Sequence, residues 1–125
     1  MSRVRGCDTK PELTIRSLVH KMGFRFRLGN RNLPGNPDLK LPRLKKVIFV
    51  HGCFWHGHKR CARAKLPGTN VKFWKEKIAK NKLRDGKNLR LLKKLGWRSL
   101  VVWQCELKDT KKIQTSLWKF LKAAL

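Results

Sequence analysis

The sequence predicts an α/β domain in which a central mixed β-sheet is flanked by helices. The chain has 125 residues, which is long enough for one hydrophobic core and too short for two. Hydrophobic residues recur at helical and strand spacings in the order helix, three strands, helix, strand, helix. This order is typical of a mixed sheet with helices packed on it, so we expect a single domain over residues 1–125.

The first helix is predicted to begin near Thr9. Thr9 suits the N-cap, Pro11 suits the first turn, and Glu12 follows Thr9 by three residues, as in a capping box. The hydrophobic face of this helix comprises Leu13, Leu18, Val19 and Met22. After Gly23, hydrophobic and charged residues alternate over residues 24–28, which predicts a half-buried strand.

Two further strands are expected before the middle of the chain. Residues 38–41 form a short strand candidate that ends at Pro42, and residues 46–50 form a buried strand with a charged entrance. A connection through residues 42–44 is short enough for the two strands to pair as a hairpin.

The second half of the chain alternates helix, strand and helix. Residues 71–95 carry hydrophobic residues at helical spacing, with Gly86 as a possible kink or break and Gly96 as the end of the helix. Residues 99–103 are a continuous hydrophobic strand, and residues 109–125 close the chain with an amphipathic helix.

The charge of the chain predicts a polyanionic partner. Lys and Arg number 32 against 7 Asp and Glu, which gives a formal net charge of +25. Nucleic acid is the favoured partner, because neutralising its phosphates releases counterions whatever the base sequence. The chain has no apolar run long enough to span a bilayer and no visible secretory signal, so we expect a cytoplasmic protein.

Three of the four cysteines are expected to bind a metal ion, because thiols in a reducing compartment are seldom paired as disulfides; Cys7 is assigned no role. Cys53 and His58 lie close in sequence, Cys61 follows, and Cys105 comes at the end of the last strand. Four such ligands fit tetrahedral zinc with no open position for water, which is typical of a structural site. The alternative is that Cys53 and Cys105 are buried thiols and that His58 is a surface residue.

Asp38 is a candidate metal ligand because acidic residues are rare in this chain. It stands at the entry to a predicted strand, from which its carboxylate can point toward His51 at the end of the next strand. Magnesium prefers such oxygen ligands and completes its octahedron with water. The alternative is a turn residue that bonds its own backbone, a frequent use of Asp beside Pro.

His51 and His56 flank Cys53 without being needed for zinc, so either could transfer a proton near neutral pH. A surface or packing role is the alternative for both. Glu12 is ambiguous, since a capping box also explains a carboxylate at a helix start. The aromatic residues Phe54, Trp55 and Trp74 could be wedges presented to a base stack or could fill the core.

The chain resembles the very short patch repair (Vsr) endonucleases, a family within the PD-(D/E)xK nuclease superfamily. The resemblance runs from Met1 to about Leu107. Its carriers are Asp8-Thr9, Pro11-Glu12, Leu33-Pro34-Gly35, Pro37-Asp38, Val47 to His58, Phe73-Trp74 through Arg84-Asp85, Gly96-Trp97, Trp103 and Cys105. The resemblance implies a restriction-endonuclease-like fold. It also implies a magnesium-dependent enzyme that nicks one DNA strand beside a T:G mismatch, the product of 5-methylcytosine deamination, to begin very short patch repair.

The resemblance also implies roles for single residues. It makes Asp38 a magnesium ligand, with the main-chain carbonyl of Val50 as another, and His56 the general base. His51 and Glu12 fall on further active-site positions. The implied structural zinc ligands are Cys53, His58, Cys61 and Cys105. The implied intercalating residues are Phe54, Trp55 and Trp74, and the implied mismatch-reading residues are Lys77 and Asn81.

The chain departs from the superfamily pattern at the second acid and the lysine, where Val50 and His51 stand instead. Two other functions remain open. One is a nuclease of the same superfamily without mismatch preference, and the other is a zinc-stapled nucleic-acid binder without catalysis. In either case the expected partner is nucleic acid. The expected enzyme is a monomer that associates with the nucleoid and acts with DNA repair proteins.

Overall fold

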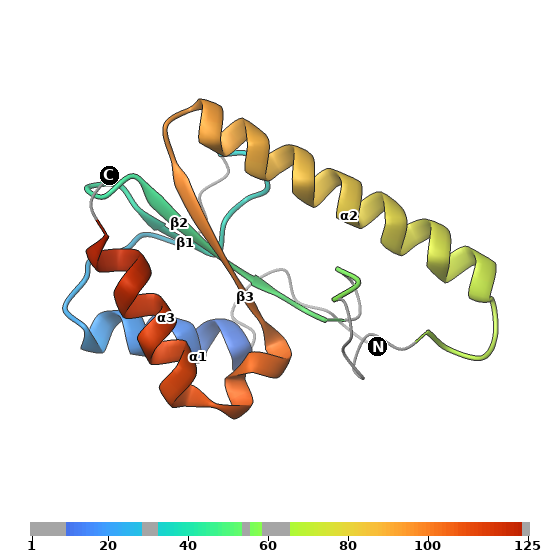
Figure 1. Cartoon of the computed structure of the whole chain (residues 1–125), viewed down its shortest axis with the longest axis horizontal. Helices are drawn as coiled ribbons and strands as arrows, with labels where there is room; N and C mark the ends of the chain where they lie inside the picture. Colours follow the sequence, from blue (N-terminus) through green and yellow to red (C-terminus); the bar gives the residue numbers. More distant parts are fainter. Residues whose placement is uncertain (1–9, 29–32, 54–55, 59–65, 124–125) are drawn as a thin grey trace.

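The computed structural model describes residues 10–28, 33–53, 56–58 and 66–123. In order these form α1 (Lys10–Lys21), β1 (Leu39–Leu41), β2 (Lys46–His51), α2 (Val71–Lys94), β3 (Arg98–Trp103), the short 3-10 helix η2 (Gln104–Lys108) and α3 (Thr110–Lys122). Helices α1 and α3 lie on one face of the sheet and α2 lies on the other (Figure 1). The predicted α/β class with a mixed sheet flanked by helices is therefore confirmed.

The sheet has the order β1-β2-β3 in the described part of the chain. Strands β1 and β2 are antiparallel, with Leu39 opposite Ile48, which confirms the predicted hairpin. Strands β2 and β3 are parallel, with His51 opposite Trp103. Since parallel strands end at the same edge, the segments that follow β2 and β3 start side by side.

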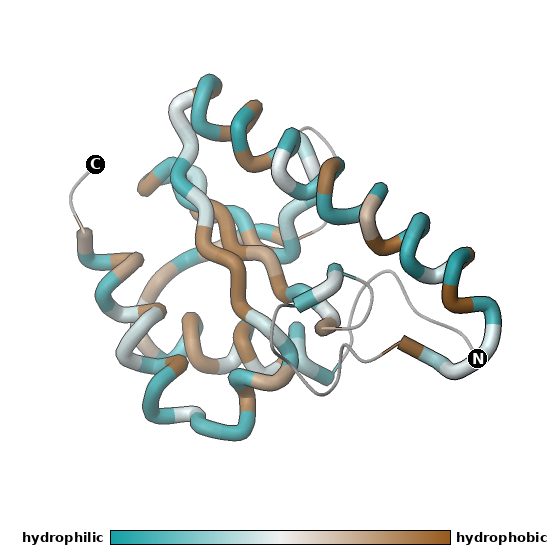
Figure 2. Tube along the Cα trace, turned by 45° about the vertical axis from the view of Figure 1, so that its right-hand side comes forward, coloured by the Kyte–Doolittle hydropathy of each residue, from teal (hydrophilic) through white to brown (hydrophobic). Residues whose placement is uncertain are grey.

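Side chains of β2 alternate between two hydrophobic clusters. Ile48 is buried, and Val50 partly so, in the cluster with α1 and α3, whereas Val47 and Phe49 pack with Leu92 of α2. This alternation follows from the two-residue period of a strand that is covered on both faces. Figure 2 shows hydrophobic residues concentrated in the strands, while α2 carries many hydrophilic ones.

Lys46 is fully buried at the start of β2, against the end of α3. Its ammonium donates hydrogen bonds to the main-chain carbonyls of Ala123 at 2.7 Å and Leu121 at 3.3 Å, and also bonds that of Phe120. The last carbonyls of a helix lack partners within it and carry partial negative charge. Lys46 thus fastens α3 to the central strand.

Two expectations for secondary structure are wrong. Residues 24–28 form no strand; Arg27 makes an isolated bridge with Lys40 in the middle of β1, because β1 is three residues long and offers little length for pairing. Helix α2 runs through Gly86 without a break, since one glycine weakens a helix by only about 1 kcal/mol. The predicted Thr9 cap lies outside the described residues.

The end of α2 matches its prediction. Gly96 has a left-handed conformation with φ of 87°, and the main-chain N–H of Trp97 donates to the carbonyl of Leu92 at 2.9 Å. Glycine adopts this conformation without strain, so the chain can turn back into β3. Among the described residues, no helix combines the length and hydrophobicity that a membrane-spanning segment requires.

Candidate active site and metal centre

Carboxyl, imidazole and thiol side chains lie close together at the edge where β2 and β3 end. His51 is the last residue of β2, and the chain continues directly to Cys53, His56 and His58. Cys105 follows the end of β3 by two residues. Because β1 is antiparallel to β2, Asp38, which precedes β1, lies at this edge too. The sheet therefore brings together most of the residues that the sequence singled out.

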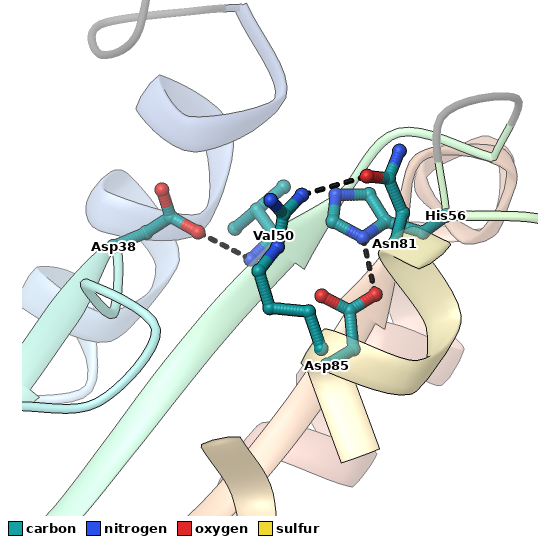
Figure 3. A network of polar contacts seen from close by, with 6 residues as sticks. Asp38, Val50, His56, Asn81 and Asp85 are labelled. Atoms are coloured by element: carbon teal, nitrogen blue, oxygen red, sulfur yellow. Dashed lines mark hydrogen bonds and ion pairs between the residues drawn. The ribbon is translucent and has the colours of Figure 1, made fainter. Parts of the chain in front are cut away.

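Asp38 bonds the neighbouring strand rather than its own turn. Its main-chain N–H donates to the carbonyl of Ile48 at 3.0 Å, and its Oδ2 accepts from the N–H of Val50 at 2.6 Å (Figure 3). A turn residue that bonds its own backbone was the alternative. The structure instead holds the carboxylate in a fixed position against the end of β2, at Val50.

Glu12 of α1 lies beside Asp38. It is 6% exposed, and its Oε2 contacts the guanidinium of Arg16 at 3.4 Å. Burial raises the pKa of Asp38 to about 7, the N–H of Val50 opposes the shift, and Glu12 adds to it through a hydrogen bond and its charge. Two neighbouring buried carboxyl groups are destabilised as anions. Their donor set fits a hard divalent cation, which would relieve that destabilisation.

A stacked pair of imidazoles lies on the other side of β2. The rings of His51 and His56 are parallel within 5°, with centroids 3.8 Å apart. His56 Nδ1 lies 2.6 Å from Oδ2 of Asp85 on α2 (Figure 3). Burial, and next the charge of His56, lower the pKa of His51 to about 4, against the opposite effect of Asp85. His51 is therefore neutral near pH 7, while Asp85 orients His56.

Gly57 allows this loop to approach α2. It has φ of 60°, and an added Cβ would overlap the Lys82 side chain and lie 2.6 Å from Cγ2 of Ile78. No other residue type fits this space and this conformation without strain. A cavity of about 370 Å³ adjoins the loop, and its lining includes His51, His56, Lys82, Asp85, Leu89 and Trp103.

Three of the four predicted zinc ligands lie together. The ligand atoms of Cys53, His58 and Cys105 are all within 4.8 Å of one another, and Cys105 Sγ is 3.4 Å from His58 Nδ1. Sulfur and nitrogen ligands of one tetrahedral zinc ion lie about 3.5 Å apart, so this donor set fits zinc. The His58 ring stacks on Trp103 at 4.1 Å. Cys61 lies outside the described residues.

The structure describes three of the five residues predicted to contact DNA. Phe54 and Trp55 lie outside the described residues. Trp74, Lys77 and Asn81 lie on the N-terminal half of α2, which extends past the sheet (Figure 1). Asn81 Oδ1 accepts from Arg84 at 2.7 Å, and the rings of Trp74 and Phe73 make a T-shaped contact.

Asp85 is the residue that reasoning from single positions missed. It belongs to a motif that resembles the family, but no role was predicted for it. The rarity of acids that drew attention to Asp38 applies equally to Asp85, one of seven in the chain. Its position four residues after Asn81 places both on one face of a helix, and that signal could have been used.

The chain is similar to known nucleases. A family model described as DNA mismatch endonuclease Vsr matches residues 1–63. The type II nicking enzyme V.XorIIP of Xanthomonas oryzae is 46% identical over 121 residues, covering 97% of this chain and 88% of that protein. The DNA mismatch endonuclease Vsr of Escherichia coli is 44% identical over 106 residues, covering 85% of this chain and 67% of that protein.

A solved structure shares the fold. The catalytic domain of the homing endonuclease I-Bth0305I superposes with a TM-score of 0.62 and 22% identity. The match covers 90% of this chain and 94% of that one. At this identity the likeness shows a common arrangement of helices and strands.

Proposed function

Because this chain belongs to the Vsr family of DNA mismatch endonucleases, it is a DNA endonuclease, and we propose that it nicks one strand beside a T:G mismatch to initiate repair. The single observation that carries the chemistry is the division of the site across the end of β2. A carboxyl pair, Asp38 and Glu12, lies on one side, and an oriented imidazole, His56, lies on the other. The proposed enzyme is one domain that acts as a monomer on duplex DNA.

Asp38 is the residue proposed to hold Mg²⁺, with Glu12 beside it and the main-chain carbonyl of Val50 as a further oxygen ligand. A bound Mg²⁺ supplies Lewis-acid stabilisation of the charge that develops on the phosphate. Val50 stands where the superfamily has a second acid, so a main-chain oxygen replaces a carboxylate. The fixed contact between Asp38 and Val50 keeps the two candidate ligands adjacent.

His56 is the proposed general base. Asp85 accepts a hydrogen bond from its Nδ1–H, which leaves Nε2 free to accept a proton from the attacking water. A carboxylate in this position also stabilises the imidazolium that forms. His51, kept neutral by burial, stacks on His56 and limits the positions that the ring can adopt. Together they present one basic nitrogen to the cavity.

The thiol cluster is proposed as a structural zinc site that includes Cys61 as its fourth ligand. It ties the segment after β2 to the end of β3, since Cys53 and Cys105 follow these two strands. His56 lies between Cys53 and His58 in sequence, so the same ion would fix the loop that carries the base.

DNA is proposed to bind across α2 and the loop after β2. The exposed Lys77 and the aromatic residues Phe54, Trp55 and Trp74 belong to these two elements. Inserting aromatic side chains costs a few kcal/mol of base unstacking and least where a mismatch has weakened the stack. Lys77 and Asn81 are the proposed readers of the mismatch.

The proposal is tested by a strand-nicking assay on three duplexes that differ at one base pair, T:G, T:A and C:G, with Mg²⁺. We expect nicking of the T:G duplex and at least about a hundredfold slower reaction on the others. Asp38→Ala should remove activity and keep DNA affinity, because the proposed partner of this side chain is Mg²⁺ and not a DNA base. Equal nicking of all three duplexes would indicate a nuclease without mismatch preference. Binding with no nicking by the wild type would indicate a non-catalytic DNA binder.

A further inference from the structure

A second group of metal-binding side chains lies outside the thiol cluster. The ligand atoms of His51, His56 and Asp85 are all within 4.8 Å of one another. His51 closes β2, His56 comes from the loop, and Asp85 comes from α2, so three elements supply one ligand each. Two imidazoles and one carboxylate are a frequent set for transition metals with open coordination positions.

His51 provides an independent indication. The residue is 8% exposed, and its Nδ1 is buried without a hydrogen-bond partner among the described residues. Such a nitrogen is costly to bury unless something satisfies it. The stacked arrangement holds the ring of His51 directly against that of His56. An imidazole nitrogen binds a metal ion in the plane of its ring, so metal binding requires His51 to turn out of the stack and direct its unpartnered Nδ1 to a cation held by His56 and Asp85.

We propose that His51, His56 and Asp85 form a further metal site, for a divalent cation of borderline softness such as Zn²⁺ or Co²⁺. The contact of 2.6 Å between His56 Nδ1 and Asp85 would lengthen to about 3.4 Å, the separation of neighbouring ligands on one tetrahedral ion. Imidazole nitrogen selects such ions over Mg²⁺, which prefers oxygen. The site therefore differs in its ligands from that of Asp38 and from the thiol cluster.

Occupation of this site is inhibitory, a consequence that rests on the proposed function. The general base acts through the orientation that Asp85 gives to His56. An ion bound to Nδ1 of His56 replaces that hydrogen bond and leaves the ring proton on Nε2, the nitrogen that would accept a proton from water. Zn²⁺ in excess of the structural site should then stop nicking while Mg²⁺ is saturating.

Binding is tested by titrating Co²⁺ into DNA-free protein whose thiol site is already loaded with Zn²⁺. We expect one additional Co²⁺ per chain, with a visible spectrum that lacks thiolate-to-metal charge transfer. His51→Gln and Asp85→Asn should each weaken this binding at least about tenfold, because each removes one ligand. Two matched variants should bind as the wild type does: His20→Gln, an exposed histidine on α1, and Asp38→Asn, at the magnesium position.

Two results would overturn the proposal. One is equal Co²⁺ affinity in wild type, His51→Gln and Asp85→Asn, and the other is loss of binding in Asp38→Asn. Circular dichroism shows whether a variant is folded. If His51→Gln unfolds, the Co²⁺ affinity of Asp85→Asn tests the proposal, because Asp85 lies on a largely exposed helix. In the nicking assay, excess Zn²⁺ should lower the rate at least about tenfold at saturating Mg²⁺. If the wild type does not nick at all, the proposed function fails, while the Co²⁺ titration still reports on the metal site.

Discussion

On the α1 and α3 side of the sheet, β1, β2 and both helices bury a continuous hydrophobic cluster, and Lys46 closes it against the end of α3. On the α2 side, the cluster among the described residues has three buried members, Val47, Phe49 and Leu92. Beyond Phe49 that face carries imidazoles and Asp85 around a cavity. One face therefore supplies most of the stability, and the other leaves room for a substrate.

The two faces also divide the chemistry. The carboxyl pair of Asp38 and Glu12 lies next to the dense core, and the burial of Asp38 there raises its pKa. The imidazoles lie on the open side, where Asp85 on α2 reaches His56. The alternation of β2 explains why they separate, since Val50 and His51 are consecutive and point to opposite faces. Substitutions on the two faces should therefore have different consequences.

The largest effect is expected on the open face. Asp85→Asn should slow nicking about a hundredfold, because the amide no longer favours the proton on Nδ1 of His56 and no longer stabilises its charged form. Stability should change little, since α2 is mostly exposed here. Single-turnover nicking and thermal unfolding measure the two effects. Glu76→Gln, an exposed acid on the same helix, is the control. If Asp85→Asn nicked as fast as wild type, the orientation of His56 by Asp85 would not contribute to the reaction.

A smaller loss of activity is expected at Gly57. Gly57→Ala should push the loop away from Ile78 and Lys82 and lengthen the contact between His56 and Asp85. We expect nicking to fall by about tenfold or more, because a displacement of this size misplaces a catalytic group. Gly68→Ala is the matched control, since an added Cβ there meets nothing within 4 Å. Equal activity of the two variants would show that the loop can shift without cost to the reaction.

The sequence could predict the elements that local patterns determine, and it could not predict those that depend on distant contacts. The hairpin of β1 and β2, the hydrophobic strand β3 and the stop at Gly96 were all predicted, because local periodicity and turn residues determine them. The strand at residues 24–28 was not formed, because pairing depends on the length of its neighbour β1. Asp85 had no assigned role, because its contact with His56 joins residues that are 29 apart in sequence.

On the packed face, Lys46→Met should lower the free energy of unfolding by about 2 kcal/mol. It keeps the buried alkyl chain but removes the ammonium that bonds three carbonyls at the end of α3. Nicking per folded molecule should be unchanged, which distinguishes this face from the other. Chemical denaturation measures the stability, with Lys111→Met, exposed on α3, as the control. A loss of activity without a loss of stability would contradict the division between the faces.

The smallest effect concerns the boundary between the faces, at Asp38. Its folded pKa of about 7 lies above the unfolded value of 3.8, so the unfolded chain loses this proton first as the pH rises. Without Mg²⁺, the wild type should therefore lose stability between about pH 4 and pH 7 from this group, by an amount of the order of 1 kcal/mol. Asp38→Asn stays neutral and should be more stable than wild type at pH 8, with the difference vanishing toward pH 4. Thermal unfolding in magnesium-free buffer without chelator measures it, and Asp109→Asn, at the exposed start of α3, should show no such gain. If Asp38→Asn were less stable than wild type at pH 8, the carboxylate would be stabilising the packed face rather than being held there against its own charge.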